Sequence, residues 1–127
     1  MVGIVIVSHS QKLAEGVVEI SRMMATDVPI AAAGGLEDGG LGTSYEKIFA
    51  AVEKVYSADG VVVLADMGSA VMTTEMVLED FGAENVRLVD CPLVEGAVVA
   101  ATESVGGISL DELIQRIENL RMTKKIS

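Results

Sequence analysis

The stretch VGIVIV, residues 2–7, is an unbroken apolar run made almost entirely of β-branched residues, and a second such run, GVVVLA, occupies residues 60–65. Apolar runs without polar alternation are typical of strands that are covered on both faces, as in a parallel sheet. Two weaker runs, residues 29–33 and 85–89, fit two further short strands. The sequence therefore predicts four strands, each followed by a segment with a different periodicity.

Those intervening segments have apolar residues at helical spacing. The residues on the predicted apolar faces are Leu13, Val17, Ile20 and Met24, then Tyr45, Ile48, Val52 and Val55, then Val71, Leu78 and Phe81, and then Val94, Val98, Ala101 and Val105. A capping box at residues 109–112 opens a fifth helix, predicted to bury Leu110, Leu113, Ile117 and Leu120. The order β-α-β-α-β-α-β-α-α predicts an α/β fold with an open, mainly parallel four-stranded sheet and helices on both faces. We expect one domain over residues 1–122 and a short C-terminal tail over residues 123–127.

Composition excludes several classes of function. The 127 residues include 19 acidic and 9 basic side chains, for a net charge of −10, so nucleic acid and anionic membranes are poor partners. There is neither an apolar run long enough to span a bilayer nor a secretory leader, which predicts a cytoplasmic protein. A single cysteine, Cys91, and a single histidine, His9, rule out an internal disulfide and argue against a metal site.

Three polar loops follow predicted strands at the edge where ligands bind in open α/β sheets. They are Ser8-His9-Ser10, the glycine-rich loop of residues 34–44, and Asp66-Met67-Gly68-Ser69. Histidine titrates near neutral pH and has a nucleophilic ring nitrogen, while glycine loops and helix N-termini offer N–H donors to phosphate oxygens. We predict that His9 accepts a phosphoryl group and that Asp66 orients its ring. The predicted phosphate-binding residues are Gly39, Gly40, Thr43, Met67, Gly68 and Ser69.

Plainer interpretations of the same residues stay open. A lone histidine at a strand end is more often structural than catalytic, and an Asp-Met-Gly-Ser turn is also an ordinary helix cap. The glycine-rich loop lacks the lysine of a phosphate-binding P-loop, and it follows the second strand rather than the first, unlike a dinucleotide-binding loop. From the residues alone, the protein is an α/β domain that binds anions through a candidate nucleophilic histidine.

Three segments also carry a family resemblance: VGIVIVSHSQKLAEGV at residues 2–17, PIAAAGGLEDGGLGTS at 29–44 and VVVLADMGSAVMTTEM at 61–76. Together they resemble the phosphotransferase subunits, DhaM, of phosphoenolpyruvate-dependent dihydroxyacetone kinases. The first domain of those subunits is similar to the mannose-class enzyme IIA domains of the sugar phosphotransferase system. Mannose-class domains usually carry a tryptophan and a Gly-Gly-Ser-Pro run after the third strand, whereas this chain has no tryptophan and its matching stretch is Asp66-Met67-Gly68-Ser69-Ala70. The resemblance spans residues 1–122 and favours the dihydroxyacetone kinase branch.

The resemblance implies that His9 takes a phosphoryl group from the phosphocarrier protein HPr and passes it to ADP on the nucleotide-binding kinase subunit. It further implies a homodimer and no cofactor on this chain, with ADP or ATP and magnesium held by the partner kinase subunit. Two alternatives remain: a sugar-uptake enzyme IIA of the mannose class, and a non-catalytic module that binds an anion or a nucleotide.

Overall fold

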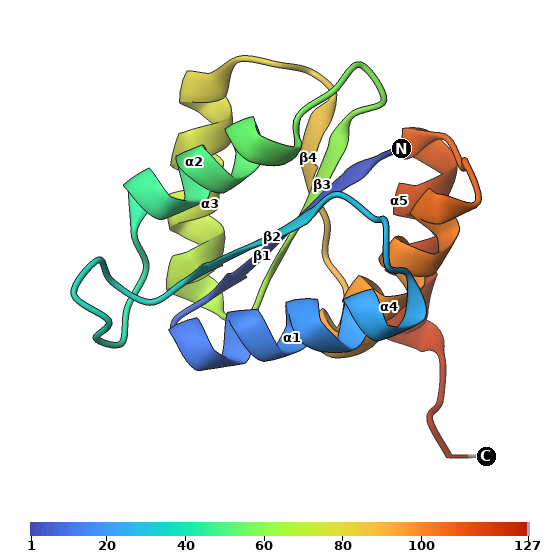
Figure 1. Cartoon of the computed structure of the whole chain (residues 1–127), viewed down its shortest axis with the longest axis horizontal. Coiled ribbons are helices and arrows are strands. Elements are labelled where there is room, and N and C mark those ends of the chain that lie inside the picture. Colours follow the sequence, from blue (N-terminus) through green and yellow to red (C-terminus); the bar gives the residue numbers. More distant parts are fainter. Residues whose placement is uncertain (127) are drawn as a thin grey trace.

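The computed structural model describes residues 1–126 and has the predicted α/β architecture (Figure 1). Four parallel strands form one sheet in the order β2-β1-β3-β4. Their bounds are β1 Gly3–Ser8, β2 Ile30–Gly34, β3 Val61–Ala65 and β4 Val86–Leu88. The helices are α1 Gln11–Met24, α2 Tyr45–Val55, α3 Gly68–Phe81, α4 Leu93–Val105 and α5 Leu110–Glu118, followed by the 3-10 helix η1 Asn119–Met122. Ser127, the last residue of the predicted tail, lies outside the described residues.

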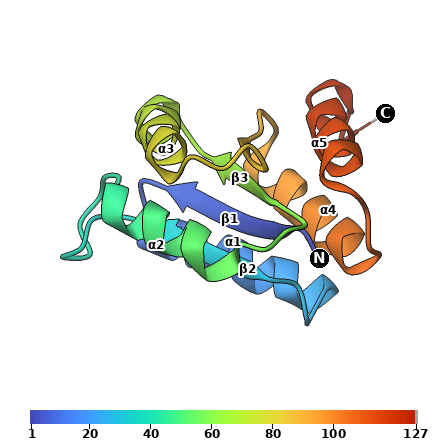
Figure 2. The same ribbon diagram turned by 90° about the horizontal axis from the view of Figure 1, so that it is seen from above.

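Two apolar cores lie on the two faces of the sheet, because successive side chains of a strand point to opposite sides. Ile4 and Ile6 of β1 belong to the core shared with α1, α4 and α5, whereas Val5 and Val7 belong to the core shared with α2 and α3. All six residues of β1 are buried, which confirms the interpretation of the unbroken apolar run. Figure 1 shows α2 and α3 on one side of the sheet and α1, α4 and α5 on the other. The view from above shows α3 and α5 at opposite ends of the molecule (Figure 2).

The predicted buried face of α1 is wrong at three of its four residues. Leu13, Ile20 and Met24 are 44%, 43% and 58% exposed, whereas Val17 is buried as predicted, together with Ala14 and Ser21. The reason is a close approach between α1 and β2. A Cβ atom added to Gly34 would lie 2.5 Å from the carbonyl oxygen of Ser10 and 2.7 Å from Cβ of Ala14. At such a separation only small side chains fit between helix and sheet, so the large ones lie on the outer face.

The predicted faces of α3 and α4 are wrong in part. Val71 of α3 and Val94 and Val105 of α4 are exposed, whereas Ala101 is buried as predicted and Leu78 and Phe81 are partly buried. The side facing the sheet is lined by small residues with one valine: Ala70, Thr74 and Val77 in α3, and Gly96, Ala97, Ala100, Ala101 and Ser104 in α4. In α2 and α5 most of the prediction is confirmed, since Ile48, Val52, Val55, Leu113 and Ile117 are buried. The other predicted residues, Tyr45, Leu110 and Leu120, are partly buried. Within residues 1–126, none of the helices has both the length and the apolar character needed to cross a bilayer.

The strand order places one crevice at the carboxyl edge of the sheet. The helix that follows β1 packs on one face, and the helix that follows β3 packs on the other, although β1 and β3 are neighbours. Such a switch point leaves an opening beyond the strand ends, where open α/β sheets bind their ligands. Ser8 ends β1, and Asp66 directly follows β3.

Candidate active site

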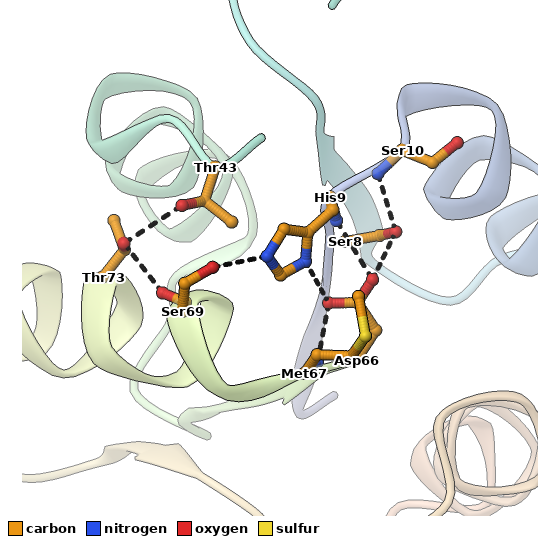
Figure 3. A network of polar contacts seen from close by, with 8 residues as sticks. All are labelled: Ser8, His9, Ser10, Thr43, Asp66, Met67, Ser69 and Thr73. Atoms are coloured by element: carbon orange, nitrogen blue, oxygen red, sulfur yellow. Dashed lines mark hydrogen bonds and ion pairs between the residues drawn. The ribbon is translucent and has the colours of Figure 1, made fainter. Parts of the chain in front are cut away.

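His9 and Asp66 meet at this switch point, as the sequence predicts. Nδ1 of His9 lies 3.0 Å from Oδ1 of Asp66, and the backbone N–H of His9 donates to Oδ2 at 3.0 Å (Figure 3). One aspartate therefore holds both the main chain and the ring of the histidine. The His9 side chain is 24% exposed, so the ring is fixed on one side and accessible on the other.

Asp66 is a carboxylate that accepts hydrogen bonds at both oxygens. Besides the two contacts with His9, the hydroxyl of Ser8 donates to Oδ2 at 2.9 Å and the amide of Met67 donates to Oδ1 at 2.8 Å. Partial burial by itself raises the pKa of Asp66. The hydrogen bonds from His9, Ser8 and Met67 outweigh burial, and the pKa of the carboxyl lies below its ordinary value. Asp66 is therefore ionised at neutral pH and can only accept hydrogen bonds from its neighbours.

An ionised Asp66 determines the tautomer of the neutral imidazole. Because the carboxylate can only accept, Nδ1 of His9 must donate, which leaves the lone pair on Nε2. Nε2 faces the first turn of α3, where its partner is the hydroxyl of Ser69. With no proton on Nε2, the Ser69 hydroxyl is the donor in this contact. The accessible nitrogen of the ring thus carries a lone pair and contacts the hydroxyl of Ser69.

The N-terminus of α3 offers unpaired amides beside Nε2. Met67, the N-cap residue, makes no side-chain cap, and within residues 1–126 the amides of Gly68 and Ser69 have no hydrogen-bond partner. Of the five α-helices in the described part of the chain, only α1 and α3 lack an acidic residue in the first turn. These are the two helices that begin at the site, in a chain with 19 acidic residues. The local field therefore suits an anion.

The two glycines predicted to bind phosphate in the glycine-rich loop have amides that already donate to other groups. The amide of Gly39 donates to the carbonyl of Leu36 at 3.0 Å, and the amide of Gly40 donates to Oδ1 of Asp38 at 2.8 Å. Both N–H groups are therefore used inside the glycine-rich loop in this conformation, and phosphate binding by Gly39 and Gly40 stays a prediction. The amide of Met67 is likewise used, by Asp66.

Three residues of the network were not singled out from the sequence. Ser8 is completely buried and donates to Asp66 while accepting from the amide of Ser10 at 3.0 Å. The amide of Gly42 donates to the carbonyl of His9 at 2.9 Å, and Thr73 in α3 contacts Thr43. Ser8 is the one with a signal in the sequence: a hydroxyl at the carboxyl end of a buried strand, next to the histidine.

Cys91 contributes nothing to this chemistry. Burial, followed by the nearby charges of Asp90 and Glu118, raises the pKa of its thiol to about 12. A thiol with such a pKa is protonated at neutral pH and is a poor nucleophile. Cys91 instead packs as a small, partly buried residue against one of the two apolar cores.

Comparison with known proteins identifies the family. A family model described as the PTS system fructose IIA component matches residues 3–118. The phosphoryl donor subunit DhaM of a PEP-dependent dihydroxyacetone kinase from Escherichia coli K12 is 42% identical over 90% of this chain, although the chain spans only 26% of that protein. The phosphotransferase subunit DhaM of a PTS-dependent dihydroxyacetone kinase from Lactococcus lactis is 34% identical, and the match covers 96% of this chain and 98% of the relative.

Solved structures support the same fold. The crystal structure of a protein of unknown function, EF1359, superposes with a TM-score of 0.84 at 29% identity and covers 100% of this chain and 99% of that one. A sigma-54 interaction domain protein from Enterococcus faecalis, at 20% identity, shares the fold with a TM-score of 0.73 over 92% of this chain and 87% of its own. The chain therefore belongs to the EIIA-man family of PTS system fructose IIA components and, within it, to the phosphoryl donor subunits DhaM.

Proposed function

We propose that the protein is a phosphohistidine relay of a cytosolic dihydroxyacetone kinase, which carries a phosphoryl group on Nε2 of His9 from HPr to ADP on the nucleotide-binding kinase subunit. The observation that carries this proposal is the pair of contacts on the imidazole. The Asp66 carboxylate accepts a hydrogen bond from Nδ1–H, so the lone pair lies on Nε2, which contacts the Ser69 hydroxyl in the first turn of α3. The name of the Escherichia coli relative, which describes a phosphoryl donor subunit, supports the direction of transfer.

The chemistry needs one nucleophile and no proton transfer to the ring. The Nε2 lone pair attacks phosphorus, the N–P bond of the phosphorylated carrier breaks, and its electron pair stays on the carrier's nitrogen. The ring of His9 then bears positive charge, which the Asp66 carboxylate stabilises through Nδ1–H. In the second step an oxygen of the terminal ADP phosphate attacks the same phosphorus, and the N–P bond electrons return to Nε2. We expect the amides of Gly68 and Ser69 to donate to the phosphoryl oxygens in both steps.

Phosphorylation is expected at Nε2 rather than Nδ1. The Nδ1 atom is 3.0 Å from Asp66, which excludes a phosphoryl group from that side and repels its charge. The phosphorylated protein, labelled with ¹⁵N in histidine, should show ³¹P coupling and shifts of an Nε2 adduct in nuclear magnetic resonance spectra. A spectrum of the Nδ1 isomer would contradict the assignment of Asp66 as the partner of Nδ1.

We also propose a homodimer. Its support is the set of large apolar side chains left exposed on two helices that lie on opposite faces of the sheet, because exposed apolar surface on a helix often marks an interface. These residues are Leu13, Ile20, Met23 and Met24 in α1, and Val71, Met72 and Met76 in α3. Sedimentation equilibrium should give about twice the 13.3 kDa mass of one chain. A mass of one chain at high micromolar concentration would contradict the dimer.

A transfer assay separates this function from its alternatives. The protein is incubated with phosphoenolpyruvate, enzyme I and HPr, and the labelled product is then mixed with single candidate acceptors. We expect loss of label to ADP on the nucleotide-binding kinase subunit. Loss of label only to a membrane permease's IIB domain would instead indicate a sugar-uptake enzyme IIA. Tight nucleotide binding in calorimetry without any labelling would indicate a non-catalytic module.

A further inference from the structure

Two threonines join the glycine-rich loop to α3. The hydroxyls of Thr43 and Thr73 lie 3.1 Å apart, and the hydroxyl of Thr73 donates to the carbonyl of Ser69 at 2.9 Å (Figure 3). A threonine hydroxyl has one proton, and that of Thr73 is used by Ser69. Thr43 must therefore be the donor in the contact between the threonines. Its single proton points to α3 and is not available to a phosphoryl oxygen.

The same stretch of the glycine-rich loop is also tied to His9. The amide of Gly42, the residue before Thr43, donates to the carbonyl of His9 at 2.9 Å. Ser69, whose carbonyl accepts from Thr73, places its hydroxyl on Nε2 of His9. The hydrogen bonds thus connect the backbone of His9 to the loop, the loop to α3, and α3 to the ring of His9. Within residues 1–126, Thr73 makes no hydrogen bond to the imidazole, so any influence on the ring passes through Ser69 and the loop.

We propose, on the basis of the phosphoryl-transfer function above, that Thr73 is a positioning residue and that the hydroxyl of Thr43 acts through it rather than as a phosphate ligand. The physical reason is preorganisation. The donors of α3 stabilise the transferring group only if they are already aligned with Nε2, and the loop must stay fixed next to them. Thr73 holds both by bonding the first turn of α3 and the loop at once. This role differs from the one predicted for Thr43 from the sequence.

The test compares variants in a single-turnover assay of His9 phosphorylation at a series of phosphorylated-carrier concentrations. Thr73→Val keeps the shape of the side chain and removes the hydroxyl, and we expect a maximal rate about tenfold lower, with the half-saturating concentration within about twofold. Thr73→Ser restores the hydroxyl and should restore the rate. Thr102→Val is the matched control, because the Thr102 hydroxyl makes the same contact in α4, to the carbonyl of Val98 at 2.9 Å, far from the site along the chain.

A double-variant comparison tests the proposed route. If Thr43 acts through Thr73, Thr43→Val lowers the rate as Thr73→Val does, and the double variant is no slower than either single one. Losses that multiply would show that Thr43 contacts the phosphoryl group directly, which overturns the proposal. A Thr73→Val rate equal to that of the wild type would also overturn the proposal. The same holds if Thr73→Ser does not restore the rate and the thermal midpoints of the variants fall along with their rates. Failure of the wild-type protein to accept any label would refute the phosphoryl-transfer function itself.

Discussion

His9→Gln should accept no phosphoryl group from the phosphorylated carrier. The chain contains one histidine, so the substitution removes every imidazole, and an amide nitrogen has no lone pair available for attack on phosphorus. Intact-mass measurement after incubation with phosphoenolpyruvate, enzyme I and HPr should show one added phosphoryl mass on the wild type and none on the variant. The wild-type adduct should be labile in acid and stable in base, as expected for a nitrogen–phosphorus bond.

The variant should remain folded, which makes its loss of label interpretable. His9 lies outside both apolar cores, in the loop between β1 and α1. The hydrogen bond from its backbone N–H to Asp66 does not depend on the side chain. Its thermal midpoint should therefore stay close to that of the wild type. A folded His9→Gln protein that still takes up label would place the acceptor on another residue, and the proposed relay would be wrong.

Asp66→Asn should slow phosphoryl transfer by about 10²–10⁴-fold, the range expected when a catalytic imidazole loses the carboxylate that sets its tautomer. An asparagine can present its NH₂ group to Nδ1. The ring would then carry its proton on Nε2, where it blocks the lone pair that attacks phosphorus. The measurement is the single-turnover rate of His9 phosphorylation. Asp27→Asn is the matched control, since Asp27 is exposed and its replacement removes the same charge.

The same variant has a signature in the pH dependence of stability. Because the pKa of Asp66 is lowered in the folded protein, the unfolded chain binds more protons as the pH falls near the ordinary value of 3.8. The stabilisation from Asp66 is therefore complete at pH values above 3.8 and is lost as the pH falls through the folded pKa. Asp66→Asn should lower the free energy of unfolding at neutral pH and make that free energy depend less on pH in the acid range.

The phosphorylation rate decides the orienting role. If Asp66→Asn were phosphorylated as fast as Asp27→Asn, the role of Asp66 in orienting His9 would be contradicted.

The position of the site could be predicted because it depends on connectivity more than on packing. His9 follows a strand that the run at residues 2–7 already identifies, and Asp66 follows the run at residues 60–65. In a parallel sheet all carboxyl ends share one edge, so residues at these ends converge without any knowledge of side-chain contacts. No such rule predicts the direction of each N–H group in the glycine-rich loop. The amides of Gly39 and Gly40 donate within the loop itself, whereas the amide of Gly42 donates to the carbonyl of His9.

The sequence by itself determined the strands, the order of helices and strands, and the pairing of one histidine with one aspartate, because each follows from periodicity and chain direction. The tertiary structure decided which faces of α1, α3 and α4 are buried and which ring nitrogen is free. Close approach of helix to sheet admits Ala14 and Ala97 but not Leu13 or Val94, and this distance is a property of the whole packed molecule. The link from Thr43 through Thr73 to Ser69 likewise exists only once a loop and a helix distant in the chain are packed together.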